Sequence, residues 1–392
     1  MSGSSTYFHN KHHYHNIEVI LHDIASFIKS NAVLCIAFLV AAITTVIVPP
    51  DAQYIEYFDF RTLTCLFCTL AVICALKNIK FFTILAEKIV AFTGNMRTSA
   101  IALIYITFIG SMLIANDMAL LTFLPLGYFV LHCTSNEKHM AKLFVLQNIS
   151  ANLGGMLTPF GNPQNLYLYS YFNIPTGEFM GIMAIPFAVS VALITLSCLL
   201  FPKTELSLNA RTNGTIIRKK TAYYLFFFVL SILIVFRVIP YYIGLPVILL
   251  AILYADRSAL KKVDYALLFT FVFFFIFAGN MARIPAVNEL MNVLLEKNTL
   301  LFSTLSCQFI SNVPSAVLLS HFTTDYKSLL LGVNIGGTGT LIASLASLIT
   351  FKSYLSYNKG AAKHFIAVFS AFNFTFLMVL YIVCHICIKF IF

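Results

Sequence analysis

The chain has 392 residues, of which 59% are hydrophobic and 10% are charged, and its formal net charge is +10 at pH 7. A soluble globular domain has about 25% charged residues, so this composition excludes an ordinary soluble protein and indicates an all-α membrane protein with many spans. In such proteins a basic excess belongs to cytoplasmic loops, and it does not indicate a nucleic-acid partner.

The chain begins with a His-rich stretch, "HNKHHYHN" at 9–16, which we interpret as part of a solvated tail over residues 1–30. The first apolar run begins only near Asn31, so we expect no signal peptide. Nine cysteines lie mostly in apolar runs, and two CxxC pairs lack the further ligands of a metal site. We therefore expect buried thiols and no bound cofactor.

A membrane span needs roughly 20 apolar residues. This rule predicts full spans at 31–49, 60–77, 143–173, 178–201, 221–240, 241–255, 264–281, 327–352 and 363–390. Two further apolar stretches, 98–133 and 299–322, are each interrupted by a short polar segment, and we interpret them as re-entrant hairpins. A pair of full spans would return the chain to the same side, so that alternative stays open. Residues 79–92 and 283–297 are predicted to be short surface helices.

The positions of the basic residues test this layout. With the N-terminus in the cytoplasm, 19 of the 25 Lys and Arg residues fall on the inner side. The remaining six are Arg61, Arg237, Arg283, Lys297, Lys327 and Lys389. This bias supports a cytoplasmic N-terminus in the cell membrane.

The sequence also contains an internal repeat. "NLGGMLT" at 152–158 matches "NIGGTGT" at 334–340, and each copy follows a polar hairpin segment, "ANDMALLTFLPL" at 115–126 or "SNVPSAVLL" at 311–319. Each half contains an Asp-led span, a surface helix, a hairpin and a Gly-broken helix. The two halves enter the membrane from opposite sides, which predicts the inverted repeats of a secondary transporter.

These features predict the following organisation. The parts are a cytoplasmic tail (1–30), a first span with an outer loop (31–59), repeat one (60–201, hairpin 98–133, broken helix 143–173), a cytoplasmic loop (202–220), connecting spans (221–262) and repeat two (263–392, hairpin 299–322, broken helix 327–352).

Unwound backbone inside a bilayer is tolerated only where protein or a water-filled cavity satisfies its polar groups. The half-helices at a break also present their ends, which attract anions at N-termini and cations at C-termini. The candidate ligand-binding residues at the hairpin tips and breaks are Asn116, Asp117, Thr158, Gly161, Asn162, Gln164 and Asn165 in the first half, and Ser311, Asn312, Ser315, Thr338, Thr340, Ser344 and Ser347 in the second.

Alternatives remain for these residues. Small residues such as Gly336, Gly337, Ser344 and Ser347 are also common where membrane helices pack closely. Asp117 is an ionisable residue in an apolar segment, and such residues usually have a functional role in membrane proteins. Three alternatives stay open: Asp117 binds a cation, carries a proton, or caps the second hairpin arm.

The absent residue types narrow the function. No Lys or Arg lies within either hairpin tip or either break. An anionic substrate would therefore rely on helix dipoles, amides and hydroxyls, with a co-bound cation. That pattern favours sodium-coupled symport of an anion, or a polar neutral substrate. The sequence has no HExxH, GxSxG or P-loop motif, so neither an enzyme nor an ATP-driven pump has support.

The paired hairpin and break motifs resemble those of the ion transporter superfamily, over roughly residues 55–355. That group includes arsenite permeases, citrate permeases, divalent anion–sodium symporters and sodium/proton antiporters. The resemblance implies a scaffold, a moving transport unit, elevator-type alternating access and a homodimer. It also implies sodium sites at Asn116 with Gly155 and Thr158, and at Asn312 with Gly337 and Thr340.

The tip sequences depart from one branch of that superfamily. Dicarboxylate and citrate symporters typically show Ser-Asn-Thr at both tips, whereas this chain has Ala115-Asn116-Asp117 and Ser311-Asn312-Val313. These tips are closer to those of arsenite permeases and antiporters.

Three functional hypotheses follow. The first is a secondary transporter for a small anion, coupled to sodium or protons. The second is a sodium/proton antiporter, with Asp117 exchanging the proton, or an arsenite-type efflux permease on the same fold. The third is a channel or a non-transporting membrane scaffold.

Overall fold

The structure is a computed structural model, and it describes residues 31–91, 93–205 and 217–391. The predicted tail, residues 1–30, and most of the predicted loop, residues 206–216, lie outside the described residues. The helices in chain order are α2 (Ala32–Ile47), η1 (Ala52–Tyr57), α3 (Phe60–Asn78), α4 (Phe81–Ala91), α5 (Met96–Ile114), α6 (Asn116–Cys133), η2 (Glu137–His139), α7 (Met140–Gly154), η3 (Gly155–Leu157), α8 (Pro163–Tyr171), α9 (Thr176–Cys198), α10 (Arg218–Val235), α11 (Tyr241–Ala255), α12 (Arg257–Lys261), α13 (Tyr265–Arg283), α14 (Pro285–Ile310), α15 (Asn312–Leu319), α16 (Tyr326–Ile335), α17 (Leu345–Tyr357) and α18 (Ala362–Phe390).

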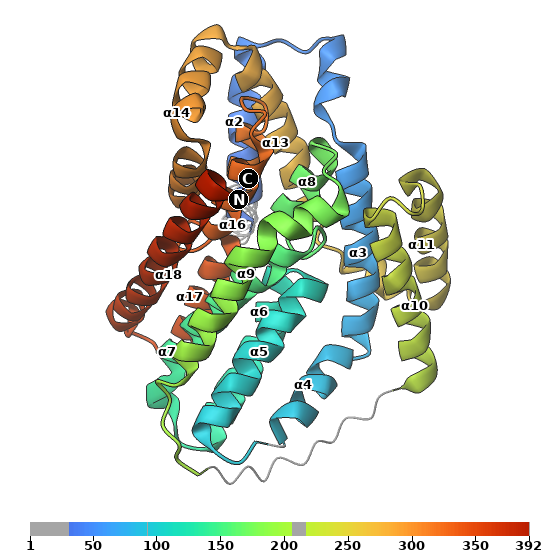
Figure 1. The fold of residues 1–392 in the computed structure, drawn as a ribbon. Helices are drawn as coiled ribbons and strands as arrows, with labels where there is room; N and C mark the ends of the chain where they lie inside the picture. The colour runs from blue at the N-terminus through green and yellow to red at the C-terminus, as the bar shows by residue number, and fades with distance from the viewer. Residues whose placement is uncertain (1–30, 92, 206–216, 392) are drawn as a thin grey trace, which may run out of the picture.

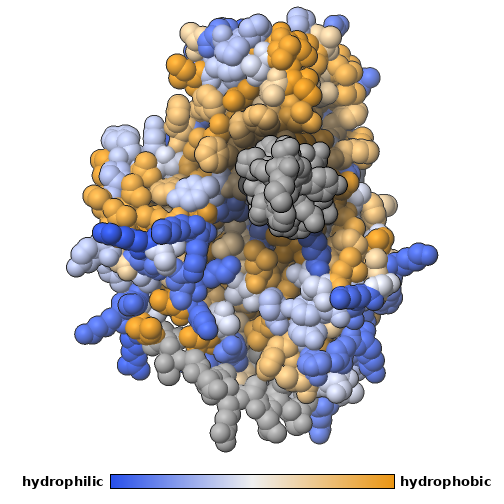
Figure 2. Space-filling model, turned by 180° about the vertical axis from the view of Figure 1, so that it is seen from behind, coloured by the Kyte–Doolittle hydropathy of each residue, from blue (hydrophilic) through white to orange (hydrophobic). Residues whose placement is uncertain are grey.

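The described residues form helices without any named strand, and a single isolated β-bridge joins Asn95 to Glu205. By length and composition, α3, α5, α9, α13 and α18 can each cross a membrane. Large apolar side chains such as Val46 and Met378 are exposed on the outer helices, and hydrophobic residues cover broad areas of the face shown in Figure 2. Exposed apolar surface of this extent indicates contact with lipid. The prediction of an all-α membrane protein is confirmed.

Both broken helices lie close to their predicted positions. The stretch 143–173 forms α7, the 3₁₀ turn η3 and α8, with an irregular segment at 158–162. The stretch 327–352 forms α16 and α17 around an irregular segment at 336–344. Helix α17 continues to Tyr357, beyond the predicted end at 352, because the Tyr354 ring is buried against Phe365 of α18 with ring centroids 4.7 Å apart.

The second hairpin and the surface helix before it meet at the predicted boundary. The predicted surface helix 283–297 and the first hairpin arm both lie within α14, which is kinked at the non-helical residue Asn298 (φ −167°, ψ 90°). The Asn298 side chain accepts a hydrogen bond from the backbone N–H of Leu301 at 2.9 Å, so it caps the second part of α14 internally. One helix therefore ends at the polar residues around Asn298, and the hairpin arm begins directly after this cap.

The two hairpins also differ in length. Helices α5 and α6 have 19 and 18 residues, which corresponds to about 27–29 Å at 1.5 Å per residue, close to the thickness of the hydrocarbon core. Helix α15 has only 8 residues, or about 12 Å, and cannot cross a membrane. The arms of the first hairpin are therefore long enough to be full spans, whereas the second arm of the other hairpin is not.

The helices pack across the two halves of the chain. Helix α8 packs against α15 and α16 of the second half, and α17 packs against α6 and α7 of the first half. Helices α10 and α11 lie on one flank beside α3, as Figure 1 shows. The broken helices thus bring the two hairpins into one central region.

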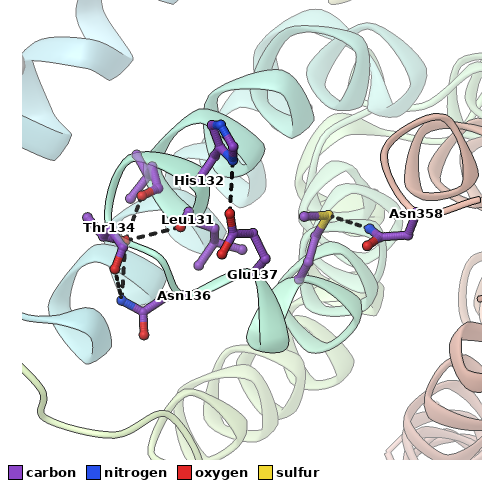
Figure 3. Close-up of polar contacts among 8 residues, drawn as sticks. Leu131, His132, Thr134, Asn136, Glu137 and Asn358 are labelled. Atoms are coloured by element: carbon purple, nitrogen blue, oxygen red, sulfur yellow. Dashed lines mark hydrogen bonds and ion pairs between the residues drawn. The ribbon is translucent and has the colours of Figure 1, made fainter.

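A compact turn joins α6 to α7 (Figure 3). His132 Nδ1 lies 2.9 Å from Glu137 Oε1, and Asn136 Nδ2 donates to the carbonyl oxygen of Thr134 at 2.8 Å. The pKa of the Glu137 carboxyl is lowered by a hydrogen bond from its own backbone N–H, and also by His132. Asn358 Nδ2, just beyond α17, lies 3.0 Å from Met140 Sδ. These contacts hold the ends of α6, α7 and α17 together, away from the hairpin tips.

Candidate functional site

The two hairpin tips have the same unusual backbone geometry. Ala115 has φ 63° and ψ 153°, and Ser311 has φ 74° and ψ 159°. Residues other than glycine rarely adopt this region, which costs about 1–3 kcal/mol, and such strain concentrates at functional sites. Each strained residue directly precedes the tip asparagine, Asn116 or Asn312.

The two tip asparagines make equivalent contacts. Asn116 Oδ1 accepts a hydrogen bond from the backbone N–H of Asp117 at 3.0 Å, and Asn312 Oδ1 accepts one from Val313 at 2.9 Å. Both asparagines are buried. Each side chain therefore folds back onto the first turn of the second hairpin arm, and both arms begin in the same way.

Both tips line one small cavity of about 50 Å³. Its lining residues are Val33, Asn116, Asp117, Pro163, Leu267, Thr270, Phe274, Ser311, Asn312, Val313, Pro314, Ser344 and Leu345. This volume holds a few water molecules or a bare ion, and it is well below the 300–1,000 Å³ of a typical small-molecule pocket. Among the predicted site residues, the cavity brings together Asn116, Asp117, Ser311, Asn312 and Ser344.

Four helices begin at this cavity. Its lining includes the first residues of α6, α8, α15 and α17, which are Asn116, Pro163, Asn312 and Leu345. A helix N-terminus has an effective charge of about +0.5, and its free N–H groups bind anions. The lining contains neither Lys nor Arg. Within this lining, partial positive charge therefore comes from the helix N-termini and not from basic side chains.

Asp117 is the acidic residue of this lining. Its Oδ1 atom is among the described buried polar atoms that have no hydrogen-bond partner. Burying an unpaired carboxylate is costly, so the group needs a proton, a bound cation or the surrounding dipoles to stabilise it.

Hydrogen bonds connect the two breaks through buried side chains. Asn152 Oδ1 accepts from Asn116 Nδ2 at 3.2 Å and from Ser344 Oγ at 2.8 Å. Asn334 Nδ2 donates to Asn165 Oδ1 at 2.6 Å. These bonds join residues of both halves, so Ser344 and Asn165 have structural partners as well as positions near the cavity.

A second group of buried bonds lies further along the broken helices. Asn148 of α7 contacts Ser347 Oγ at 3.2 Å and Thr350 Oγ1 at 3.3 Å, both in α17. The predicted site residue Ser347 therefore contributes to helix packing across the halves. Asn148 and Thr350 were not predicted to be part of this network.

The first break depends on two glycines. A Cβ atom on Gly161 would lie 2.3 Å from the Gly155 carbonyl oxygen, and one on Gly155 would lie 2.4 Å from Asn162 Oδ1. Only glycine permits this close approach of the two sides of the break. Four polar atoms around this break are buried without a hydrogen-bond partner among the described residues, namely Asn152 Nδ2, Thr158 Oγ1, Asn162 Oδ1 and Gln164 Oε1.

At the second break most of the polar atoms are paired. Thr340 Oγ1 donates to the Gln308 carbonyl oxygen at 2.9 Å, and Thr338 Oγ1 donates to the Ile335 carbonyl oxygen at 2.6 Å. Ser315 Oγ lies 2.9 Å from Ser306 Oγ within the hairpin. Gly337 approaches the tip, since a Cβ there would lie 3.0 Å from Asn312 Nδ2. Thus Ser315, Thr338 and Thr340 lie near the cavity but do not line it.

Gln308 is a polar residue of this region that the sequence analysis missed. It lies one helical turn before Asn312, and its side-chain amide reaches the backbone of the second break. The available signal was a Gln four residues before the tip, in a hairpin arm whose other polar residues are the hydroxyl residues Thr299, Ser303, Thr304 and Ser306.

No group of three His, Cys, Asp or Glu residues close enough to hold a metal ion occurs within the described part of the chain. The nine cysteines are free thiols, including the CxxC pairs Cys65/Cys68 and Cys384/Cys387. Seven of them, these four included, are buried, and Cys133 is exposed.

This fold and central site define a membrane transporter. A family model described as CitMHS, citrate transporter, matches residues 20–326. The chain therefore belongs to the citrate transporter family, and the resemblance to the ion transporter superfamily is confirmed.

Two known proteins are similar to this chain in sequence, and one solved structure is similar in fold. The chain is 36% identical over 299 residues to the uncharacterized transporter MJ0456 of Methanocaldococcus jannaschii, covering 75% of this chain and 81% of the relative. It is 26% identical to the inner membrane protein YbiR of Escherichia coli, covering 69% and 74%. The crystal structure of the Alcanivorax borkumensis YdaH transporter matches with a TM-score of 0.54 at 10% identity, covering 91% of this chain and 97% of that one. That last similarity concerns the fold alone.

Proposed function

We propose that this transporter moves a small anion across the cell membrane, coupled to sodium ions or protons, by elevator-type alternating access between two inverted repeats. The observation that carries the proposal is the cavity at which α6, α8, α15 and α17 all begin. Four N-termini of about +0.5 charge each supply roughly two positive charges. They attract an anion without any basic side chain, and weak dipolar binding also allows release.

Asp117 supplies the coupling in this proposal. A carboxylate in the same cavity repels an anionic substrate, so the anion binds well only when Asp117 is protonated or paired with a cation. Loading the anion and loading the coupling ion then favour each other, which is the thermodynamic basis of symport.

A second candidate function keeps the same residue in a different role. The unpartnered Oδ1 atom of Asp117 also suits a sodium/proton antiporter, in which the carboxyl exchanges a proton for a cation and no anion is carried. The two candidates differ in whether ion movement requires an anion.

Uptake into proteoliposomes tests the proposal. Labelled citrate, a smaller dicarboxylate and an inorganic oxyanion would each be offered under an inward sodium gradient, an inward proton gradient, or neither. We expect uptake of at least one anion that depends on one of the two gradients. Gradient-driven proton movement of equal size with and without anion would instead support the antiporter. Conductance far above carrier turnover would contradict both.

The cytoplasmic N-terminus and the homodimer are parts of the same proposal. The distribution of Lys and Arg, with 19 of 25 on one side of the predicted layout, supports the orientation, and the family resemblance is the basis for the homodimer. Labelling of single cysteines from one side of sealed vesicles tests the orientation, and mass measurement in detergent or nanodiscs tests the dimer. Labelling of Cys133 from the outside of intact cells would contradict the orientation.

A further inference from the structure

The unwound backbone of the second break is held by one side-chain amide. Gln308 Nε2 lies 2.9 Å from the Gly336 carbonyl oxygen, 3.1 Å from that of Thr338 and 3.1 Å from that of Thr304. An amide nitrogen has two N–H groups, yet three carbonyl oxygens surround it. Convergence of backbone carbonyls on one point is also how proteins replace the hydration shell of a cation.

The orientation of this amide is fixed by its other atom. Gln308 Oε1 accepts a hydrogen bond from the backbone N–H of Thr340 at 2.9 Å. Rotation of the amide by 180° would set an oxygen against three carbonyl oxygens and the nitrogen against an N–H donor, so both contacts exclude it. Gly339, with φ +118°, leaves the space for this side chain, since a Cβ there would lie 2.1 Å from Gln308 Oε1.

The first break has the same arrangement with a different residue. Asn165 Nδ2 lies 3.2 Å from the carbonyl oxygens of Gly155 and Met156 and 3.3 Å from that of Thr158. Its Oδ1 atom accepts a hydrogen bond from Asn334 Nδ2 at 2.6 Å, which again fixes the orientation. One carboxamide nitrogen therefore faces three carbonyl oxygens in each half: three of the break in the first half, and two of the break together with Thr304 of α14 in the second.

The two amides are not equivalent positions of the repeat. When Asn152 is aligned with Asn334, Asn165 aligns with Ser347, whose hydroxyl contacts Asn148 instead. When the tips are aligned, Gln308 aligns with Met112, which has no N–H donor. Each half thus supplies one amide to its own break, from α8 in the first half and from α14 in the second.

We propose that the neutral side-chain amides of Asn165 and Gln308 occupy the positions that a cation would take at the two breaks. Sodium therefore cannot bind at either break. The exchangeable cation or proton of the transport cycle is then held at Asp117 alone. This inference rests on the coupling role given to Asp117 in the proposed function, and it replaces the two break-centred sodium sites that the family resemblance implies.

Thermal unfolding of the purified, full-length protein tests the inference directly. The probe is sodium chloride, compared with choline chloride at equal concentration, because an ion that binds the folded state raises its apparent stability. The background is Asp117→Asn, which removes the carboxylate. We expect this variant to unfold at the same temperature in both salts. In Asp117→Asn/Gln308→Ala the amide no longer occupies the space between the carbonyl oxygens, so we expect sodium to raise the unfolding temperature specifically.

A matched control is Asp117→Asn/Gln147→Ala. Gln147 is also a buried glutamine, but its Nε2 atom contacts only one backbone carbonyl, that of Phe123 at 3.2 Å, together with Thr107 Oγ1. We expect no sodium-specific shift for this variant. If Gln308→Ala does not fold, Gln308→Glu keeps the side-chain length, removes the donors and should also gain a sodium-specific shift.

Two results would overturn the inference. A sodium-specific shift that persists in Asp117→Asn would show that a break binds sodium with its amide in place. A folded Gln308 variant without any gain would show that the amide does not occupy a cation position. Neither readout requires a transported anion, so failure of the proposed function would appear separately, as absence of gradient-dependent uptake by the wild-type protein.

Discussion

The two hairpin tips have the same shape but different charge. Ala115 and Ser311 share one strained backbone conformation, and the asparagine that follows each makes the same contact with the next N–H. The residue after the asparagine differs between the tips: it is Asp117, which has a carboxyl group, in the first tip and Val313 in the second. The comparison teaches that the two tips share one backbone geometry at the cavity, while the carboxylate to which we assign ion coupling is found at the first tip alone.

The largest effect is expected from removing that difference. Asp117→Asn keeps the size of the side chain and removes its charge, so we expect ion-coupled uptake into proteoliposomes to fall to background at unchanged membrane abundance. The matched control is Val313→Thr, an isosteric change at the equivalent position, which should keep most of the activity. Normal ion dependence in Asp117→Asn would contradict the asymmetric account.

A second prediction tests the symmetric part of the comparison. Asn116→Ala and Asn312→Ala each remove a cavity-lining amide, so we expect both variants to lose transport while membrane abundance stays close to wild type. Each substitution removes one side-chain hydrogen bond to the next backbone N–H, and a typical hydrogen bond contributes about 1 kcal/mol, too little to unfold the protein. Normal transport by either variant would mean that its tip does not contribute to the binding site.

The sequence predicted the tips and breaks well because polar residues inside a bilayer are costly and therefore conspicuous. Asn116, Asp117, Asn312 and Ser344 could be selected in this way, and the structure brings them together at one cavity. The glycines of the first break were also recognisable, since a broken helix that folds back tightly needs them.

The presence of a polar residue in an apolar segment does not show which residues its side chain contacts. Gln308 contacts backbone atoms 28–32 residues away, and such contacts depend on how α14 and α16 pack, which local patterns do not encode. Likewise, Ser347 looked like a ligand-binding residue, but its hydroxyl contacts Asn148 of the other half. By contrast, the boundary between the surface helix and the second hairpin could be predicted, because Asn298 caps the second part of α14 through a local contact.

A third prediction compares the packing of the two breaks. A Cβ on Gly154 would lie 2.3 Å from the Phe108 carbonyl oxygen, whereas one on Gly336 would lie 2.6 Å from the Gly332 carbonyl oxygen and 2.8 Å from Cys307 Sγ. We expect Gly154→Ala to lower the free energy of unfolding by about 3 kcal/mol and Gly336→Ala by about 2 kcal/mol. Thermal unfolding in detergent measures both.

Gly181 of α9 provides the control for that pair, because a Cβ there would meet nothing within 4 Å. Gly181→Ala should therefore be neutral or stabilising by up to about 1 kcal/mol, as alanine favours a helix. Equal destabilisation by all three substitutions would indicate a general effect of alanine and not close packing at the breaks.

A smaller effect is expected from relieving strain at the tips. Ala115→Gly should raise the free energy of unfolding by about 1 kcal/mol, because glycine adopts positive φ without penalty. Ser311→Gly should gain less, since Ser311 Oγ also contacts the Ala343 carbonyl oxygen at 3.3 Å. Ala102→Gly inside α5 should destabilise instead. Destabilisation by Ala115→Gly would show that the tip backbone is not strained.

The smallest effect is expected at an exposed carboxylate, which serves as a reference for Asp117. Hydrogen bonding to Arg283, at 2.6 Å, lowers the pKa of Asp51 below its usual value of 3.8. This pair therefore contributes stability above about pH 4, and the contribution is lost as the pH falls through the lowered pKa. Asp51→Asn should lower the unfolding temperature slightly at pH 7 and leave transport unchanged.

The most direct test of the shared cavity is an experimental structure of the protein with its transported anion or coupling ion bound. We expect density for the ligand between the two tips, in contact with Asn116 or Asp117 on one side and with Ser311 or Asn312 on the other. Density that contacts only one tip, or lies outside this cavity, would contradict it.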